Sequence, residues 1–131
     1  MKQYLGVALG MVAGSVLGAG AITALHAQAK PPAYFVIEIN KINDAAGFKT
    51  ITDIPTGGAD AAKELGGYYI ARGGKITALD GSAPPERFIA YAFDSVEKAQ
   101  AFNNSEYFKK VSAVRNKTTD ARAFIVEGLP K

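Results

Sequence analysis

Cysteine and tryptophan are absent from this 131-residue chain, and histidine occurs once, at His26. Without cysteine the protein has no disulfide, no thiol nucleophile and no thiolate zinc site. Because His26 lies in the N-terminal segment, the rest of the chain also lacks the imidazole that a catalytic triad or a ligated haem requires. Carboxylates, tyrosines, lysines, arginines and hydroxyls remain for chemistry, and we expect neither a metal nor a cofactor.

An excess of charge of one sign is also missing. The 15 Lys and Arg residues exceed the 12 Asp and Glu residues by only three, which is too little for a protein that neutralises a run of phosphates. The sequence also has no glycine-rich phosphate loop, dinucleotide fingerprint or EF-hand loop. Nucleic acid is therefore not an expected partner.

The N-terminal 29 residues contain one charged residue, Lys2, followed by an uncharged, mostly apolar run. Ala27-Gln28-Ala29 matches the small-x-small form of a signal-peptidase site. We expect residues 1–29 to be a secretory signal peptide and the mature protein to be exported, to the periplasm. The alternative is an uncleaved membrane anchor, since Tyr4 to Leu25 is close to the ~20 residues that span a bilayer. The membrane is a partner only in that case.

Cleavage after Ala29 leaves about a hundred residues, enough for one domain. Residues 30–32, Lys-Pro-Pro, form a stiff linker, and the domain is expected over residues 33–129. Four segments rich in β-branched and aromatic residues are predicted strands, namely 33–40, 68–72, 87–93 and 121–127.

Helices are predicted between the first and second strands and between the third and fourth. Asp44 or its neighbour Asn43 caps the first helix, which Pro55 and the following glycines interrupt before it resumes over 59–65. Asp94, with Glu97 three residues on, predicts a capping box for the next helix, and Ser105 caps a further one. The order β-α-β-β-α-β predicts an α+β, ferredoxin-like fold.

All four predicted strands carry large apolar residues on both faces. Helices cover one face of such a sheet, which leaves the other too apolar for water. We therefore expect a homodimer in which two sheets pair face to face.

Several short segments resemble a known family, the domain-of-unknown-function family 1330, over roughly residues 33 to 129. These segments are Arg72-Gly73-Gly74, Leu79-Asp80-Gly81 before Pro84-Pro85, Arg87, Phe93-Asp94-Ser95, Asn104-Ser105-Glu106-Tyr107, Arg115 and Val126-Glu127-Gly128. The resemblance implies a dimeric α/β-barrel of ferredoxin-like protomers. That superfamily includes cofactor-free monooxygenases, isomerase-like enzymes and proteins of no known activity. The break at Pro55 departs from the unbroken first helix usual in such proteins.

Five residues are candidates for ligand binding. Arg72 and Arg87 flank the connection between the second and third strands, where their forked donors suit a planar oxyanion, unless each pairs with a structural carboxylate. Glu38 faces away from its apolar neighbours, toward the interior of a barrel, where it either accepts a proton or binds an arginine. Tyr107 and Arg115 are poised between contacts with a ligand and ordinary helix roles.

The leading hypothesis is an exported homodimer that binds a small anionic or aromatic molecule between the two sheets. Aromatic residues that would line such a space are Tyr34, Tyr68, Tyr69, Tyr91 and Phe93. One alternative is a cofactor-independent oxygenase or isomerase in which Glu38 or Tyr107 moves a proton. Another is a structural or stress-related envelope protein with a filled interior, so whether the protein is an enzyme stays open at this point.

Overall fold

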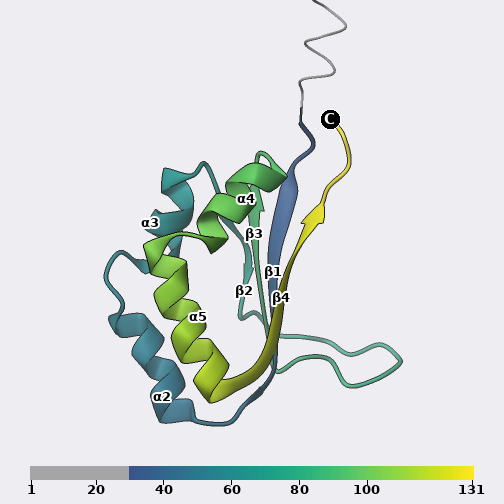
Figure 1. Cartoon of the computed structure of the whole chain (residues 1–131). Coiled ribbons are helices and arrows are strands. Elements are labelled where there is room, and N and C mark those ends of the chain that lie inside the picture. The colour runs from purple at the N-terminus through teal and green to yellow at the C-terminus, as the bar shows by residue number, and fades with distance from the viewer. Residues whose placement is uncertain (1–29) are drawn as a thin grey trace, which may run out of the picture. The chain divides into compact units, whose positions relative to one another are not determined.

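The domain is built on a four-stranded antiparallel sheet with strand order β2-β3-β1-β4 (Figure 1). A computed structural model describes residues 30–131, so the predicted signal peptide, the alternative anchor and His26 lie outside the described residues. The strands are β1 (Ala33–Ile42), β2 (Tyr68–Arg72), β3 (Arg87–Phe93) and β4 (Thr119–Glu127).

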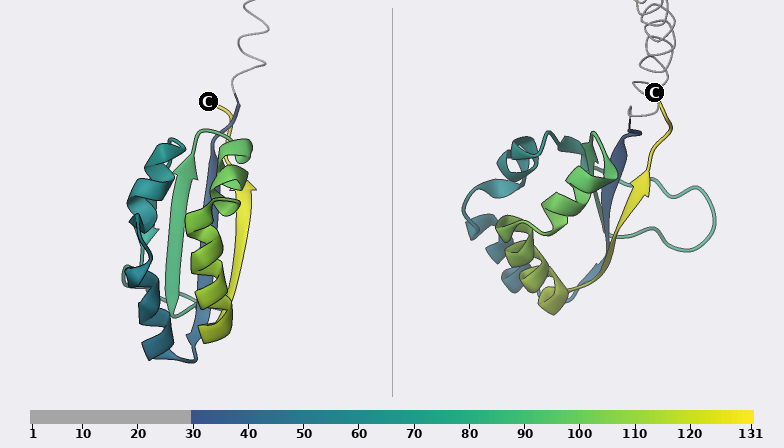
Figure 2. Two further views of the ribbon diagram at one scale, coloured as in Figure 1. Left: turned by 60° about the vertical axis from the view of Figure 1, so that its left-hand side comes forward. Right: turned by 45° about the horizontal axis from the view of Figure 1, so that its top comes forward.

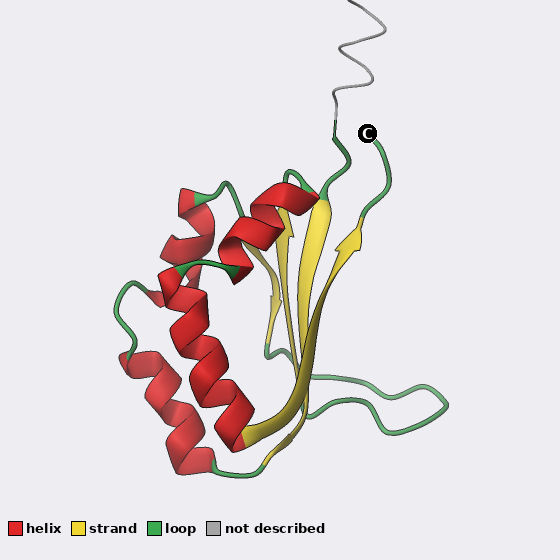
Figure 3. Ribbon diagram, in the orientation of Figure 1, coloured by secondary structure: helices red, strands yellow, loops and turns green. Residues whose placement is uncertain are grey.

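The helices lie on one side of this sheet (Figures 2 and 3). They are α2 (Ala45–Lys49), the 3-10 helix η1 (Thr50–Asp53), α3 (Gly57–Glu64), α4 (Val96–Asn103) and α5 (Glu106–Thr118). The element order and sheet order are those of the ferredoxin-like fold that the sequence predicted. In the part of the chain that the structure describes, no helix is long and apolar enough to cross a bilayer.

The core fills the layer between the sheet and the helices. Phe35, on the central strand β1, makes edge-to-face contacts with Phe102 of α4 and Phe108 of α5, at ring-centroid distances of 5.5 and 4.8 Å. All three side chains are at most 2% exposed. Aromatic pairs in this geometry contribute about 0.5–1.5 kcal/mol beyond the area they bury, and here they join α4 and α5 to the sheet.

The connection from β1 to β2 is not one continuous helix. It passes through α2 and η1, turns at Pro55 and restarts as α3, as the proline and the paired glycines predicted. Thr56 and Gly57 both have positive φ, 85° and 74°. A right-handed helix does not pass through two such residues, so the break is built into the backbone.

Helix ends match the sequence signals with one correction. Ser105 caps α5 as predicted, its hydroxyl accepting a hydrogen bond from the Phe108 N–H. The cap of α4 is Ser95, which accepts from the Lys98 N–H, whereas the capping box predicted for Asp94 is wrong. Asp94 lies one residue too early and instead pairs with the Lys98 ammonium at 3.3 Å.

The face of the sheet that carries no helix, called the open face below, is apolar over much of its area. Phe124 and Val126 of β4 remain 41% and 47% exposed there, and Tyr68 of β2 is 62% exposed. Glu38 lies on this face and accepts a hydrogen bond from Arg122 of β4. The connection from β2 to β3 projects on the same side (Figure 1).

Gly67, just beyond the end of α3, tests the packing of helix end on sheet. A Cβ at this position would lie 2.3 Å from the Phe93 ring, whereas one at Gly74 would meet nothing within 4 Å. We expect Gly67→Ala to lower the free energy of unfolding by about 1–3 kcal/mol, the usual cost of overpacking. Gly74→Ala should leave it unchanged or slightly raised. Equal denaturant midpoints for the two variants would contradict this packing.

Candidate functional site

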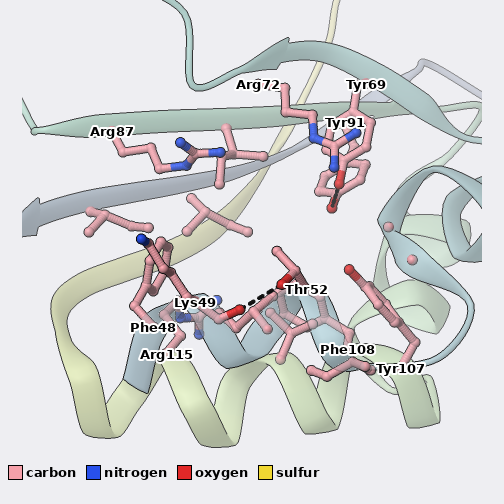
Figure 4. A pocket seen from close by; sticks show the side chains of 18 residues that line it. Phe48, Lys49, Thr52, Tyr69, Arg72, Arg87, Tyr91, Tyr107, Phe108 and Arg115 are labelled. Atoms are coloured by element: carbon pink, nitrogen blue, oxygen red, sulfur yellow. Dashed lines mark hydrogen bonds between the residues drawn. The ribbon is translucent and has the colours of Figure 1, made fainter. Parts of the chain in front are cut away.

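A cavity of about 480 Å³ lies between the helix-covered face of the sheet and the helices η1 and α5. Its size falls within the usual range for small-molecule sites. The middle of the cavity is apolar, because isoleucines line it from both sides: Ile37, Ile39 and Ile89 from the sheet, and Ile51 and Ile54 from the crossover. Polar side chains gather toward the two ends (Figure 4).

One end, called the arginine end, carries Arg87 from β3 and Arg115 from α5, with Lys49 beside them (Figure 4). Arg115 is only 8% exposed, although it is charged. Its Nε and Nη1 atoms are buried and have no hydrogen-bond partner, and the same is true of the Nε of Arg87. Buried guanidinium donors without hydrogen-bond partners lower the stability of the folded protein. The arginine end is therefore destabilising in the absence of a ligand that accepts from these donors.

Burial lowers the pKa of the Arg115 guanidinium from its ordinary value. An arginine nonetheless stays protonated at neutral pH. Its guanidinium also lies 5.5 Å from the centroid of the Phe108 ring, an attractive contact but not a hydrogen bond. The positive charge at this end is therefore held by packing and lacks an acidic partner in the cavity wall.

The position of the Arg87 side chain depends on Gly73, which directly follows the neighbouring strand β2. A Cβ at Gly73 would lie 2.6–2.9 Å from the Arg87 guanidinium atoms. Gly73 also has a φ of 65°, in the left-handed region that favours glycine. The Arg72-Gly73-Gly74 turn thus leaves room for Arg87 to lie along the cavity.

The opposite end, called the tyrosine end, gathers the hydroxyls of Tyr69, Tyr91 and Tyr107 around Gly58, the second residue of α3. A Cβ on Gly58 would lie 2.1, 2.9 and 3.0 Å from these three oxygens. Tyr69 and Tyr91 stack with ring centroids 4.3 Å apart, and the Tyr91 hydroxyl donates to that of Tyr69 at 2.9 Å. The Arg72 guanidinium lies over the Tyr69 ring, 4.5 Å from its centroid.

Tyr91 and Tyr107 stay protonated at this end of the cavity. Burial, reinforced by the hydrogen bond to Tyr69, raises the pKa of Tyr91 far above its usual 10.0. Burial raises the pKa of Tyr107 as well, although the nearby Arg72 opposes the shift. Both hydroxyls are neutral hydrogen-bonding groups at physiological pH.

The structure brings four of the five predicted site residues to this one cavity: Arg72, Arg87, Tyr107 and Arg115. Glu38 is separate, since it lies on the open face and pairs with Arg122. The cavity itself lies between the sheet and the helices of this one chain. Of the aromatic residues expected to line a barrel, Tyr69 and Tyr91 line this cavity, whereas Tyr34 and Tyr68 pair with open-face positions of neighbouring strands.

Sequence reasoning missed Gly58 and the convergence of the tyrosines on it. From the sequence the paired glycines predict only a break in the helix, because a close approach to side chains distant in sequence leaves no local pattern. Among residues 30–131, no group of three or more carboxylates or imidazoles is placed to hold a metal ion.

Two solved structures share the fold. A protein of unknown function from Rhodopseudomonas palustris superposes with a TM-score of 0.58 at 12% identity, covering 85% of this chain and 94% of its own. A methylated form of that protein gives 0.56 at 12% identity, over 83% and 90%. No curated protein matches the sequence. The family model described as domain of unknown function (DUF1330) matches residues 32–129, which is most of the chain, and the protein therefore belongs to that family.

Proposed function

We propose that the protein binds a small organic anion in the cavity of each protomer, with a carboxylate at the arginine end and an apolar or aromatic body along the isoleucines. The observation that carries this proposal is Arg115, a buried guanidinium with two unpartnered nitrogen atoms. A carboxylate supplies the acceptors that these donors lack, in the planar geometry that arginine prefers. Among the described residues that line the cavity none is acidic, so an anion meets no repulsion there.

We further propose that the protein works as an exported homodimer. The exposed apolar side chains of the open face support pairing of two sheets, since contiguous apolar surface marks an interface. The apolar N-terminal run with Ala27-Gln28-Ala29 supports export to the periplasm. In such a dimer the cavity of each protomer stays on the outer, helix side of its own sheet.

The alternatives receive less support. A purely structural role favours an interior filled with side chains, which a cavity of about 480 Å³ does not match. An oxygenase or isomerase that uses Glu38 as its base would need that carboxylate in the cavity, and it lies on the opposite face of the sheet. Tyr107 remains as a group that could exchange a proton with a ligand.

Arg115→Met tests the anion site directly, with 3-phenylpropanoate as the probe and the full-length chain as the protein. Hydrogen bonds to charged groups contribute about 1.5–3 kcal/mol each, so we expect affinity measured by calorimetry to fall at least about tenfold. The unliganded variant should be as stable as the wild type or more so, because methionine removes an uncompensated buried charge. Thermal unfolding without and with the probe measures both effects.

Lys110→Met on the exposed side of the same helix is the matched control, since it removes one positive charge away from the cavity. It should bind the probe like the wild type. Wild-type affinity in Arg115→Met, together with a large loss of stability, would assign Arg115 a structural role and contradict the proposal.

Phe124→Lys on the open face tests the dimer. A lysine buried between two paired sheets is costly. The molecular mass measured by sedimentation should therefore fall from that of a dimer to that of a monomer. Ala113→Lys, which adds the same charge at an exposed position of α5, should remain dimeric. A monomeric wild type, or a dimer that tolerates Phe124→Lys, would refute pairing through the open face.

A further inference from the structure

The tyrosine end has hydrogen-bonding capacity that the protein does not use. Three hydroxyls converge on Gly58, but among residues 30–131 the only hydrogen bond of these groups runs from Tyr91 to Tyr69. Because the Tyr69 oxygen accepts this bond, its own proton remains to be donated. The Tyr107 hydroxyl has no hydrogen-bond partner in the part of the chain that the structure describes. The hydroxyls of Tyr69 and Tyr107 can therefore both form a hydrogen bond with a ligand atom placed beside Gly58.

The site depends on a glycine in a helix. Alanine is favoured over glycine inside helices by roughly 0.5–1 kcal/mol, and the backbone of Gly58 is not in the left-handed region, unlike that of Gly57. Local structure thus gives no reason for glycine here. The reason lies in the tyrosine end, because a Cβ would come within 2.1 Å of the Tyr69 hydroxyl and fill the space that the three oxygens share.

The two ends are separated by a similar length on both walls. On β3, Arg87 pairs with Ile39 and Tyr91 with Phe35, four positions apart along the strand, or ~13 Å at about 3.3 Å per residue. On α5, Tyr107 and Arg115 are eight residues apart, which is about 12 Å along a helix. A molecule that spans from one end to the other carries two polar groups joined by an apolar body.

From the proposed anion site we infer a narrower class of ligand: the tyrosine end binds a hydroxyl oxygen at the far end of the molecule, so the cavity takes a hydroxyaryl carboxylate. The carboxylate lies at Arg115 and Arg87, the ring packs between the isoleucines and the stacked pair of Tyr69 and Tyr91, and the hydroxyl lies at Gly58. A hydroxyl both donates and accepts, as do the phenols around it. The raised pKa values of Tyr91 and Tyr107 agree with this, since both groups keep their protons.

The test compares 3-(4-hydroxyphenyl)propanoate with 3-phenylpropanoate, which differ only in the ring hydroxyl, on the full-length protein. A hydroxyl that gains partners in a site built for it contributes enough for about a tenfold difference in affinity. Analogues with shorter and longer spacers between ring and carboxylate locate the length at which this ratio is greatest. We expect the wild type to prefer the hydroxylated probe about tenfold at the best length.

Tyr107→Phe should bring the ratio of the two affinities close to one, because it removes one hydroxyl and leaves the ring. Gly58→Ala should also lower this ratio, but with a loss of affinity for both probes, because its Cβ displaces Tyr69 and Tyr91. Tyr34→Phe is the matched control, since Tyr34 lies across from Val126 on the open face, and it should keep the wild-type ratio. Circular dichroism of Gly58→Ala checks that α3 is retained.

The outcomes separate this inference from the proposal on which it rests. If both probes bind through Arg115 with equal affinity, or if Tyr107→Phe weakens both probes alike, the hydroxyl site is wrong and the anion site stands. If neither probe binds the wild type at any spacer length, the anion site and the hydroxyl site both fail. A tenfold ratio that Tyr107→Phe removes and Gly58→Ala lowers supports the assignment.

Discussion

The break in the crossover between β1 and β2 is the constraint on which the rest of the site depends. Thr56 and Gly57 take positive φ one after the other, so the segment that in one piece would lie along the sheet is divided into α2 with η1 and a separate α3. Residues on both sides of the break line the cavity, Ile54 before it and Gly58 after it. The break thus brings an isoleucine and a glycine from two separate segments to the wall of one cavity.

The two faces of the sheet use the same types of charged residue in opposite ways. On the open face Glu38 and Arg122 pair with each other, directly opposite on neighbouring strands, so their charges are compensated within the chain. On the helix face Arg87 and Arg115 are left with unpartnered donors. The partly exposed pair of Glu38 and Arg122 is neutral as a unit, while a buried cation without a partner is costly. The uncompensated charges therefore lie on the side of the sheet where we propose the anion site, and the compensated pair lies on the open face, where we propose the dimer contact.

The strands were the most predictable part of the molecule, because each is a short run rich in β-branched and aromatic residues, which favour strands. Both β2 and β3 begin and end at the predicted residues. Arg115 could also have been placed, because it follows Phe108 by seven residues and Val111 by four, and so belongs to the buried stripe of α5. The cavity could not be predicted from the sequence, because its size depends on the distance between the divided crossover and the sheet. The role of Gly58 was equally hidden, because its close neighbours Tyr69, Tyr91 and Tyr107 are distant in sequence.

The composition of the cavity wall also limits its chemistry. Among the described residues that line it are three arginines, a lysine and three tyrosines, without a carboxylate or an imidazole. Such a wall stabilises negative charge on a ligand but is poor at removing a proton, because the buried Tyr91 and Tyr107 have raised pKa values and hold their own protons. Under the proposed function, the ligand arrives already ionised, with its negative charge near the arginines and its far end near the phenols. A small anion is thus the ligand that the proposed function assigns to this wall, because its arginines and its lysine supply positive charge.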